Sequence, residues 1–369
     1  MVSFNAGKPN NSLSLLPPLN DIETKAVLKK CIEARTALAE LKVAGDLIPN
    51  QTVLINIIPL LEAKDSSEIE NIVTTTDRLF QYAFNETSSM DSSTKEALRY
   101  RTALFNGYSS LSRRPISTST AVEVCSHIKG TLMEIRKGPG VALANEKTKQ
   151  VIYTPPDGEN MIRELLKNWE SFLHDHTEMD PLVRMAVGHY QFEAIHPFTD
   201  GNGRTGRVLN LLFLVSEGLL NQPILYLSRY IIRNKSAYYS LLQGVTESQD
   251  WEPWVLYILD GVQSTARWTS EKVAAIKLLM DETVNYVKKN AEKIYTRELV
   301  EIIFSQPYCR IQTLIDAEIV QREAAARYLK TLVEIGVLKE LKVGRDKIFI
   351  HLKLMELLKD DENILVPYQ

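Results

Sequence analysis

The sequence predicts a mainly α-helical protein with a β-hairpin in its middle and a winged helix-turn-helix at its C-terminal end. Three observations support this fold class. Apolar residues recur at helical spacing through most of the region before residue 291. The clearest strand-like runs, each flanked by turn residues, lie within 141–153 and 338–351. The composition changes near residue 291, where the predicted elements become shorter.

The chain is long enough for two or three domains, since it has 369 residues. We expect an N-terminal helical segment over residues 1–110, a helical core over 111–290 and a winged-helix domain over 291–369. Residues 1–20 contain Pro17-Pro18 and several Asn and Ser residues, which predict an extended lead-in that lies over the body. Apolar spacing then predicts four helices, over residues 21–44, 50–61, 66–85 and 93–114.

A β-hairpin is predicted after a further helix. We expect that helix over 126–136, with Gly138-Pro139-Gly140 breaking it. Two short apolar runs, 141–144 and 150–153, are separated by a Glu-Lys-Thr turn, and Pro155-Pro156 follows them. This pattern is typical of a hairpin. An amphipathic helix over 161–174 should lead from it to the next element.

The stretch from His196 to Arg207 concentrates groups that bind phosphate. A helix over Pro181 to Ile195, with Asp180 as its N-cap, should deliver His196 at its C-terminal edge. Gly201-Asn202-Gly203 then lets backbone N–H groups converge where a second helix begins. We expect that helix from Arg204 to Glu217. The N-terminus of such a helix binds oxyanions.

Charged side chains complete this predicted site. Arg204 and Arg207 lie three residues apart on one helix face, where they can bind phosphate oxygens. Asp200 has a short carboxylate that can hold a hard cation such as Mg²⁺. A nucleotide polyphosphate with its metal would satisfy all of these groups.

Each feature alone has an ordinary explanation, because a histidine at a helix end is more often structural and Gly-Asn-Gly is usually only a turn. Together, in strict register, they resemble the His-x-Phe-x-Asp/Glu-Gly-Asn-Gly-Arg-x-x-Arg signature of the Fic family, and residues 196–207 meet every position. No Gly-Lys-Ser/Thr follows the glycines, which argues against a Walker P-loop. No glycine-rich strand loop of a kinase is present.

The resemblance covers roughly residues 66–254 and implies a Fic-type helical core that acts as a protein adenylyltransferase (AMPylator). Such an enzyme moves AMP from ATP to a Ser, Thr or Tyr hydroxyl of a target protein. His196 would be the catalytic base, since the unperturbed pKa of histidine lies near working pH, and Asp200 would hold Mg²⁺. The implied nucleotide-binding residues are Glu70, Phe198, Thr199, Asp200, Gly201, Asn202, Gly203, Arg204, Arg207, Asn234 and Tyr238.

Two of these residues lie beyond the motif, at the start of a helix predicted over 234–246. Fic members carry a tyrosine pair at a similar distance after the motif, and by this resemblance Tyr238 would line the adenine pocket. Asn234 is a second candidate. Partial burial in a helical core is the ordinary explanation for adjacent tyrosines such as Tyr238 and Tyr239.

The resemblance also implies a target-binding role for the hairpin. In Fic proteins a hairpin flap upstream of the motif clamps the target segment by strand addition. Gln150, Val151, Ile152 and Tyr153, just before the double proline, are similar to that flap. A β-edge of this kind recognises backbone more than side chains. The partner would be a protein substrate, including the chain itself in self-modification.

Residues 66–71, Ser-Ser-Glu-Ile-Glu-Asn, resemble an inhibitory Ser/Thr-x-x-x-Glu-Gly/Asn motif that some Fic proteins carry N-terminal to the core. Ser66 and Glu70 fall in register with it. Glu70 would then pair with Arg207 and occupy the guanidinium that should hold the γ-phosphate. Ser67 and Glu70 also fit a capping box, which would merely start a helix. Both explanations stay open at this point.

The region after the motif should continue as helices and end in a winged helix-turn-helix. We expect a short apolar segment over 223–230, helices over 251–266 and 271–290, and then a smaller unit. That unit has predicted helices over 296–304, 311–317 and 321–334, and strands over 338–343 and 347–351 around Gly344-Arg345-Asp346. This order resembles a winged helix-turn-helix.

DNA binding would be the usual function of such a unit, and Arg322, Arg327 and Lys330 on its third helix favour it. Residues 291–352, however, hold ten Lys or Arg and nine Asp or Glu, a net charge of about +1, which is a poor footprint for a DNA binder. A protein-interaction or dimerisation role, giving a homodimer, has at least equal support. A transcription regulator, or a related Fic activity such as AMP removal or use of another nucleotide-linked donor, stays an alternative.

The overall composition is ordinary for a globular protein. The formal net charge of −3 gives no indication of a nucleic-acid or membrane partner. Cys31, Cys125 and Cys309 lie far apart without metal-ligand spacing, so we expect reduced core thiols. No basic stretch followed by an apolar run begins the sequence, and no apolar segment approaches the length of a membrane span, so we expect a cytoplasmic protein.

Overall fold

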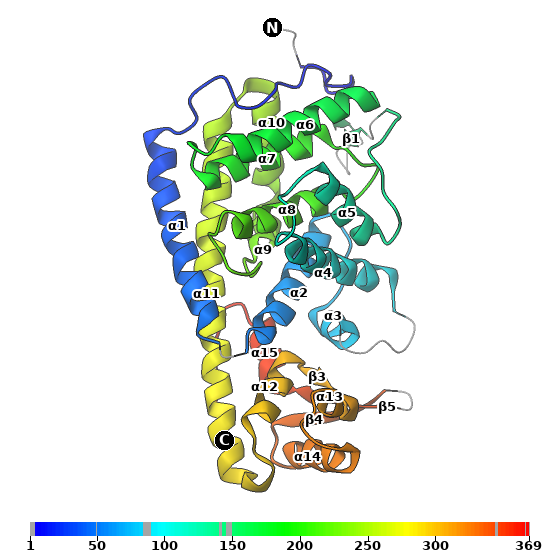
Figure 1. Cartoon of the computed structure of the whole chain (residues 1–369), viewed down its shortest axis with the longest axis vertical. Coiled ribbons are helices and arrows are strands. Elements are labelled where there is room, and N and C mark those ends of the chain that lie inside the picture. Colours follow the sequence, from blue (N-terminus) through cyan, green and yellow to red (C-terminus); the bar gives the residue numbers. More distant parts are fainter. Residues whose placement is uncertain are drawn as a thin grey trace.

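The computed structural model describes residues 4–48, 50–83, 90–139, 142–144, 150–343, 346–365 and 367–368. The fold is mainly helical, as predicted, with two small antiparallel sheets. Figure 1 shows a body of stacked helices with α11 (Trp251–Asn290) as a long spine and α1 (Lys25–Asp46) beside it. The smaller C-terminal unit lies at the far end of that spine.

The N-terminal region forms α2 (Thr52–Ile69), α3 (Thr76–Ala83) and α4 (Ser92–Ser110) after α1. The prediction of one helix over 66–85 is wrong, because Ser66 belongs to the last turns of α2 and the chain reverses at Asn71, whose φ is 62°. The apolar spacing fades after Leu61 because α2 then buries carboxylates. Glu62 accepts hydrogen bonds from the backbone and hydroxyl of Ser228 (2.9 and 2.6 Å), so the helix stays packed although its buried face is polar.

The central region holds α5 (Thr118–Lys129), the hairpin strands β1 (Leu143–Ala144) and β2 (Val151–Tyr153), and α6 (Glu159–Asp175). The helix predicted over 126–136 begins and ends at the wrong residues, because α5 starts at Thr118 and ends at Lys129. Ser117 caps the true start, and Gly130 ends the helix in the left-handed conformation, with φ 65°. The hairpin is confirmed, with Leu143 paired to Tyr153. Gly140, Val141 and the predicted turn residues 146–148 lie outside the described residues.

Two helices lie on either side of the motif, and their bounds are close to the predicted ones. They are α7 (Pro181–Ile195) and α8 (Asn202–Ser216), which pack against each other. The chain continues with α9 (Leu227–Arg233) and α10 (Lys235–Ser248). The two helices predicted over 251–290 are one, α11. Thr265 and Thr269 lie buried inside it and donate to the carbonyl oxygens of Gly261 and Thr265, both at 2.7 Å, so neither hydroxyl interrupts the helix.

The C-terminal unit has the order predicted for a winged helix-turn-helix. Its elements are the 3₁₀ turn η1 (Glu292–Ile294), α12 (Arg297–Ser305), β3 (Tyr308–Cys309), α13 (Ile311–Asp316), α14 (Arg322–Glu334), β4 (Leu338–Val343), β5 (Asp346–His351) and α15 (Leu352–Lys359). The sheet has the antiparallel order β3-β5-β4. Neither β3 nor α15 is predicted from the sequence. Gly344 and Arg345 lie outside the described residues.

Side chains tie this unit and the N-terminal segment to the helical body. The buried Lys272 of α11 donates to the carbonyl oxygens of Leu357 and Asp360 at the end of α15, at 2.5 and 2.6 Å. Near the other end, Asn168 of α6 exchanges two hydrogen bonds with the backbone of Leu16 (2.7 and 2.9 Å), so the lead-in lies over the body as expected. No described helix has the length and apolarity needed to cross a membrane. All three cysteines are buried, and none forms a disulfide.

Candidate active site

His196 lies at the C-terminal end of α7, where the sequence placed it. Asp180 caps the start of that helix by accepting from the backbone N–H of Leu182 at 2.8 Å. His196 itself ends the helix in the left-handed conformation, with φ 50° and ψ 59°. Its Nδ1 lies 3.3 Å from the carbonyl oxygen of Glu193. Burial lowers the pKa of His196 to about 4, so its imidazole is neutral at pH 7.

The loop after His196 is fixed by Asn202 rather than left open. The Asn202 side chain accepts from the backbone N–H of Phe198 and donates to its carbonyl oxygen, both at 2.8 Å. Phe198 is 1% exposed and anchors the loop in the core, whereas Thr199 and Asp200 face solvent. The Asn202 amide, which the resemblance assigns to nucleotide binding, therefore uses two of its hydrogen-bonding groups to hold the loop.

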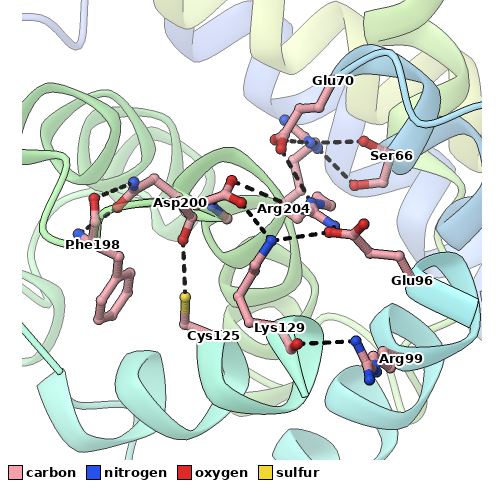
Figure 2. A network of polar contacts seen from close by, with 12 residues as sticks. Ser66, Glu70, Glu96, Arg99, Cys125, Lys129, Phe198, Asp200 and Arg204 are labelled. Atoms are coloured by element: carbon pink, nitrogen blue, oxygen red, sulfur yellow. Dashed lines mark hydrogen bonds and ion pairs between the residues drawn. The ribbon is translucent and has the colours of Figure 1, made fainter. Parts of the chain in front are cut away.

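Glu70 binds both motif arginines, Arg204 and Arg207, and Figure 2 shows its carboxylate beside Arg204. One carboxylate oxygen accepts from Arg207 Nη2 at 2.7 Å, and the other accepts from Arg204 Nε at 3.1 Å. Both guanidinium groups are almost fully buried, while the Glu70 side chain is 23% exposed. The pairing of Glu70 with Arg207 that the sequence suggested is thus present, and Arg204 shares the same carboxylate.

Gly203 explains how the Glu70 carboxylate comes so close to α8. Any Cβ at position 203 would overlap Glu70 Oε1 and crowd Arg207 Nη1 at 2.9 Å. The carboxylate therefore lies over the first turn of α8, where free backbone N–H groups and the positive end of the helix dipole attract an anion. Glu70 fills the place where the sequence predicts phosphate binding.

The segment that presents Glu70 is held by Ser66. Arg207 donates to the Ser66 hydroxyl through Nε and to the Ser66 carbonyl oxygen through Nη2, both at 2.8 Å. The capping-box explanation for Ser67 and Glu70 is wrong, because Glu70 is the residue that follows the last turn of α2 and starts no helix. Ser66 and Glu70 thus both face the arginines of α8.

Sequence reasoning missed Lys129 and Glu96, which surround Asp200 and Arg204 (Figure 2). Lys129, at the end of α5, forms ion pairs with Asp200 and, at 3.3 Å, with Glu96. Glu96 of α4 also accepts from Arg204 Nη1 at 2.5 Å. Burial alone would raise the pKa of Asp200, but Lys129 and Arg204 lower it overall. No local motif marks either residue, since each reaches the site only through the packing of its helix.

A magnesium ion fits this arrangement only together with a nucleotide. The described residues contain no group of three or more His, Cys, Asp or Glu side chains that could hold a metal by themselves. Mg²⁺ is commonly bound by one or two carboxylates plus substrate phosphates and waters. The 57% exposed carboxylate of Asp200, beside the arginine-lined start of α8, meets that requirement.

The remaining predicted residues belong to α10, to the residue before it and to the hairpin. Tyr238 is in the core, 2% exposed, with its hydroxyl 2.9 Å from His189 Nε2, whereas Tyr239 is 47% exposed. Asn234 precedes α10 and donates to the carbonyl oxygen of Tyr230 at 2.9 Å. Tyr153 of β2 donates to the carbonyl oxygen of Ala194 at 2.8 Å, which ties the hairpin to the end of α7. Gln150 is exposed, and Val151 and Ile152 are half-buried.

A helical core that presents a histidine beside an arginine-lined helix N-terminus, with a hairpin bound to the end of α7, defines a domain of the Fic type. The chain belongs to the Fic/DOC family. It matches the family's N-terminal domain over residues 28–109, the Fic/DOC domain over 116–214, and the C-terminal domain described as "Protein adenylyltransferase SoFic-like" over 279–354.

Similar proteins agree with this assignment. The chain is 31% identical over 135 residues to protein adenylyltransferase fic-1 of Caenorhabditis elegans, which covers 36% of the chain and 24% of that protein. It is 33% identical over 144 residues to a probable protein adenylyltransferase of Aquifex aeolicus, covering 37% of the chain and 41% of that protein. Each match thus spans less than half of its curated relative.

Solved structures show the same fold. A Fic family protein from Desulfovibrio desulfuricans G20 superposes with a TM-score of 0.57 and 18% sequence identity, covering 91% of this chain and 98% of that one. A fragment of Fic-1 from C. elegans gives a TM-score of 0.50 and 19% identity, covering 69% of this chain and 74% of that one.

Proposed function

We propose that this chain is a protein adenylyltransferase that Glu70 holds in a state of low activity. The observation that supports this best is the Glu70 carboxylate, bound by Arg204 and Arg207 over the first turn of α8. A site that binds a carboxylate through two buried guanidinium groups and a helix N-terminus is built for an anion. The names of the related proteins assign AMP transfer to them, and the match of residues 116–214 to the Fic/DOC domain supports the same activity for this chain.

The reaction would proceed in line at the α-phosphorus of ATP. His196, neutral at pH 7, would take the proton of a Ser, Thr or Tyr hydroxyl as the hydroxyl oxygen bonds to phosphorus. The bond to the β-phosphate breaks, and pyrophosphate leaves. The backbone N–H groups at the start of α8 would stabilise the charge on the transferring group, while Arg204 and Arg207 would bind the outer phosphates. Asp200 would hold Mg²⁺, which supplies positive charge to the phosphates.

ATP labelled at different phosphates tests the proposed reaction. Label in the α-phosphate should become attached to protein, and label in the γ-phosphate should leave as pyrophosphate. Retention of the γ-label on protein would instead identify a phosphate transferase, and loss of AMP from a modified protein would identify the reverse activity.

The pH profile provides a second test. The reaction needs the neutral imidazole of His196, and burial lowers the pKa of that group to about 4. The transfer rate should therefore stay constant as the pH falls below 7, and it should decrease only as the pH falls through about 4. The value of kcat/KM at each pH reports the pKa of the free enzyme. Loss of half the activity near an ordinary histidine pKa, about 6.5, would contradict this assignment.

The hairpin is proposed to bind the target segment through the backbone of β2. Ile152→Pro removes an N–H group and disturbs this strand, so transfer to protein should fall several-fold while ATP binding persists. Ile152→Thr is the matched control, because it changes the side chain, keeps the N–H group and favours a strand. Equal transfer rates for the proline and threonine variants would exclude strand pairing at this position.

A further inference from the structure

Arg136 is a buried guanidinium at the base of the hairpin that none of the motifs includes. It lies between α5 and β1 and is 4% exposed. Burial lowers the pKa of Arg136, yet its side chain binds carbonyl oxygens instead of forming an ion pair with a described carboxylate. Burying a cation that forms no ion pair is costly, and the charge of Asp157 offsets this cost only in part. The hydrogen bonds of Arg136 therefore indicate which groups this residue holds in place.

Two of these hydrogen bonds hold the end of α7. Arg136 Nε donates to the carbonyl oxygen of His196 at 2.8 Å, and Nη2 donates to that of Ile195 at 3.2 Å. The Arg136 backbone N–H also donates to the carbonyl oxygen of Pro197 at 2.9 Å. The cation thus lies at the negative end of the α7 dipole, where it is favoured. It also holds His196 in a left-handed conformation that a residue with a side chain rarely adopts.

The other hydrogen bonds hold both ends of the hairpin segment. Nη1 donates to the carbonyl oxygen of Gly138 at 3.2 Å, and Nη2 donates to that of Pro156. These two carbonyl groups lie before β1 and after β2. Tyr153 adds a parallel link from β2 to Ala194 of α7. One planar guanidinium therefore joins the two ends of the hairpin to the backbone of His196.

We propose that Arg136 is a positioning residue, which fixes the imidazole of His196 relative to the hairpin strand that receives the target segment. This inference rests on the proposed function in so far as it concerns AMP transfer. The guanidinium also acts through its charge, because a nearby cation disfavours protonation of the imidazole. The negative charges of Glu70 and Asp200 raise the pKa of His196. The carbonyl oxygen of Glu193 accepts a hydrogen bond from Nδ1 of the imidazole.

Arg136→Gln and Arg136→Lys in the full chain separate the two contributions. The Gln variant removes both the charge and the fork of donors, so kcat for transfer should fall by about 10- to 100-fold, as for a misplaced catalytic group. The affinity for ATP, measured by calorimetry, should change less than twofold, since Arg136 contacts none of the residues proposed to bind phosphate. The Lys variant keeps the charge but not the fork, so it should also lose transfer.

Titration of His196 by NMR, in protein labelled at its histidines, supplies a readout that does not need activity. The pKa of His196 should rise in Arg136→Gln, because one of the charges that lower it is removed, and stay near that of the wild type in Arg136→Lys. Arg184→Gln is the matched control, because Arg184 is also buried and donates to a carbonyl oxygen, that of Leu173, but lies at the other end of α7. It should lower the melting temperature without moving the His196 titration.

An unchanged His196 titration in Arg136→Gln, beside a melting temperature lowered as in the control, would overturn the proposal. Should the Gln variant fail to fold, an Arg136→Lys variant with the transfer rate of the wild type would also overturn it. If the wild-type chain transfers no AMP under any condition, the proposed function fails. The NMR comparison would still decide whether Arg136 sets the state of His196.

Discussion

Replacing His196 by alanine should lower AMP transfer by about 10²-fold to 10⁴-fold, the usual range for a positioned acid-base group, while ATP binding stays largely intact. The imidazole lies at the end of α7, whereas the groups proposed to bind phosphate lie on α8. Removing the imidazole therefore leaves the arginines and the start of α8 in place. Initial rates with labelled ATP and the ATP affinity from calorimetry, measured on the same preparation, test this directly.

His176→Ala is the control for this variant. His176 follows α6 and forms its contact with Glu178 away from the site, so its loss should change neither quantity. An ATP affinity that falls as far as the transfer rate in His196→Ala would assign His196 to nucleotide binding and remove it as the base.

Replacing Glu70 by glycine should raise auto-modification by about 10- to 100-fold. The change frees Arg204 and Arg207 to bind the outer phosphates, and a hydrogen bond to a charged group contributes ~1.5–3 kcal/mol, where 1.36 kcal/mol corresponds to tenfold in rate. Without nucleotide this variant should have a lower melting temperature, because two buried guanidinium groups lose a partner. ATP should then raise the melting temperature of Glu70→Gly by more than it raises that of the wild type.

Glu68→Gly is the matched control, since Glu68 lies two residues earlier in α2 and pairs with Lys64 instead of the arginines. It should lower the melting temperature without raising activity. Arg207→Ala also breaks the contact with Glu70, but it removes a proposed phosphate ligand and should not raise activity. The effects of Glu70→Gly and Arg207→Ala should be non-additive, because the two side chains are in contact. Equal rates for the wild type and Glu70→Gly would exclude inhibition by Glu70.

The elements around His196 could be predicted from the sequence because local residues define them. Asp180 and Pro181 start α7, and Gly201, with φ 82°, starts α8, so spacing alone gives both helices and the groups between them. The end of α2 could not be predicted in the same way. Its buried face carries Glu62 and Asp65, which accept hydrogen bonds from the distant residues Ser228 and Tyr226, and polar residues on a buried face hide the helical spacing.

The residues that support the site were missed for a related reason. Lys129, Glu96 and Arg136 come from three separate parts of the chain and meet the motif only through tertiary packing. A motif search detects residues close in sequence, whereas these residues form ion pairs and hydrogen bonds across 60 or more positions. The three-dimensional arrangement is therefore needed to recognise them.

Intact-mass spectrometry of the wild type, Glu70→Gly and the Glu70→Gly, His196→Ala double variant, each incubated with ATP and Mg²⁺, tests the central claim most directly. We expect Glu70→Gly to gain the mass of AMP, the wild type to gain it slowly, and the double variant to gain none in the same time. A Glu70→Gly protein that gains no AMP, or gains the mass of a phosphate group instead, would contradict the account.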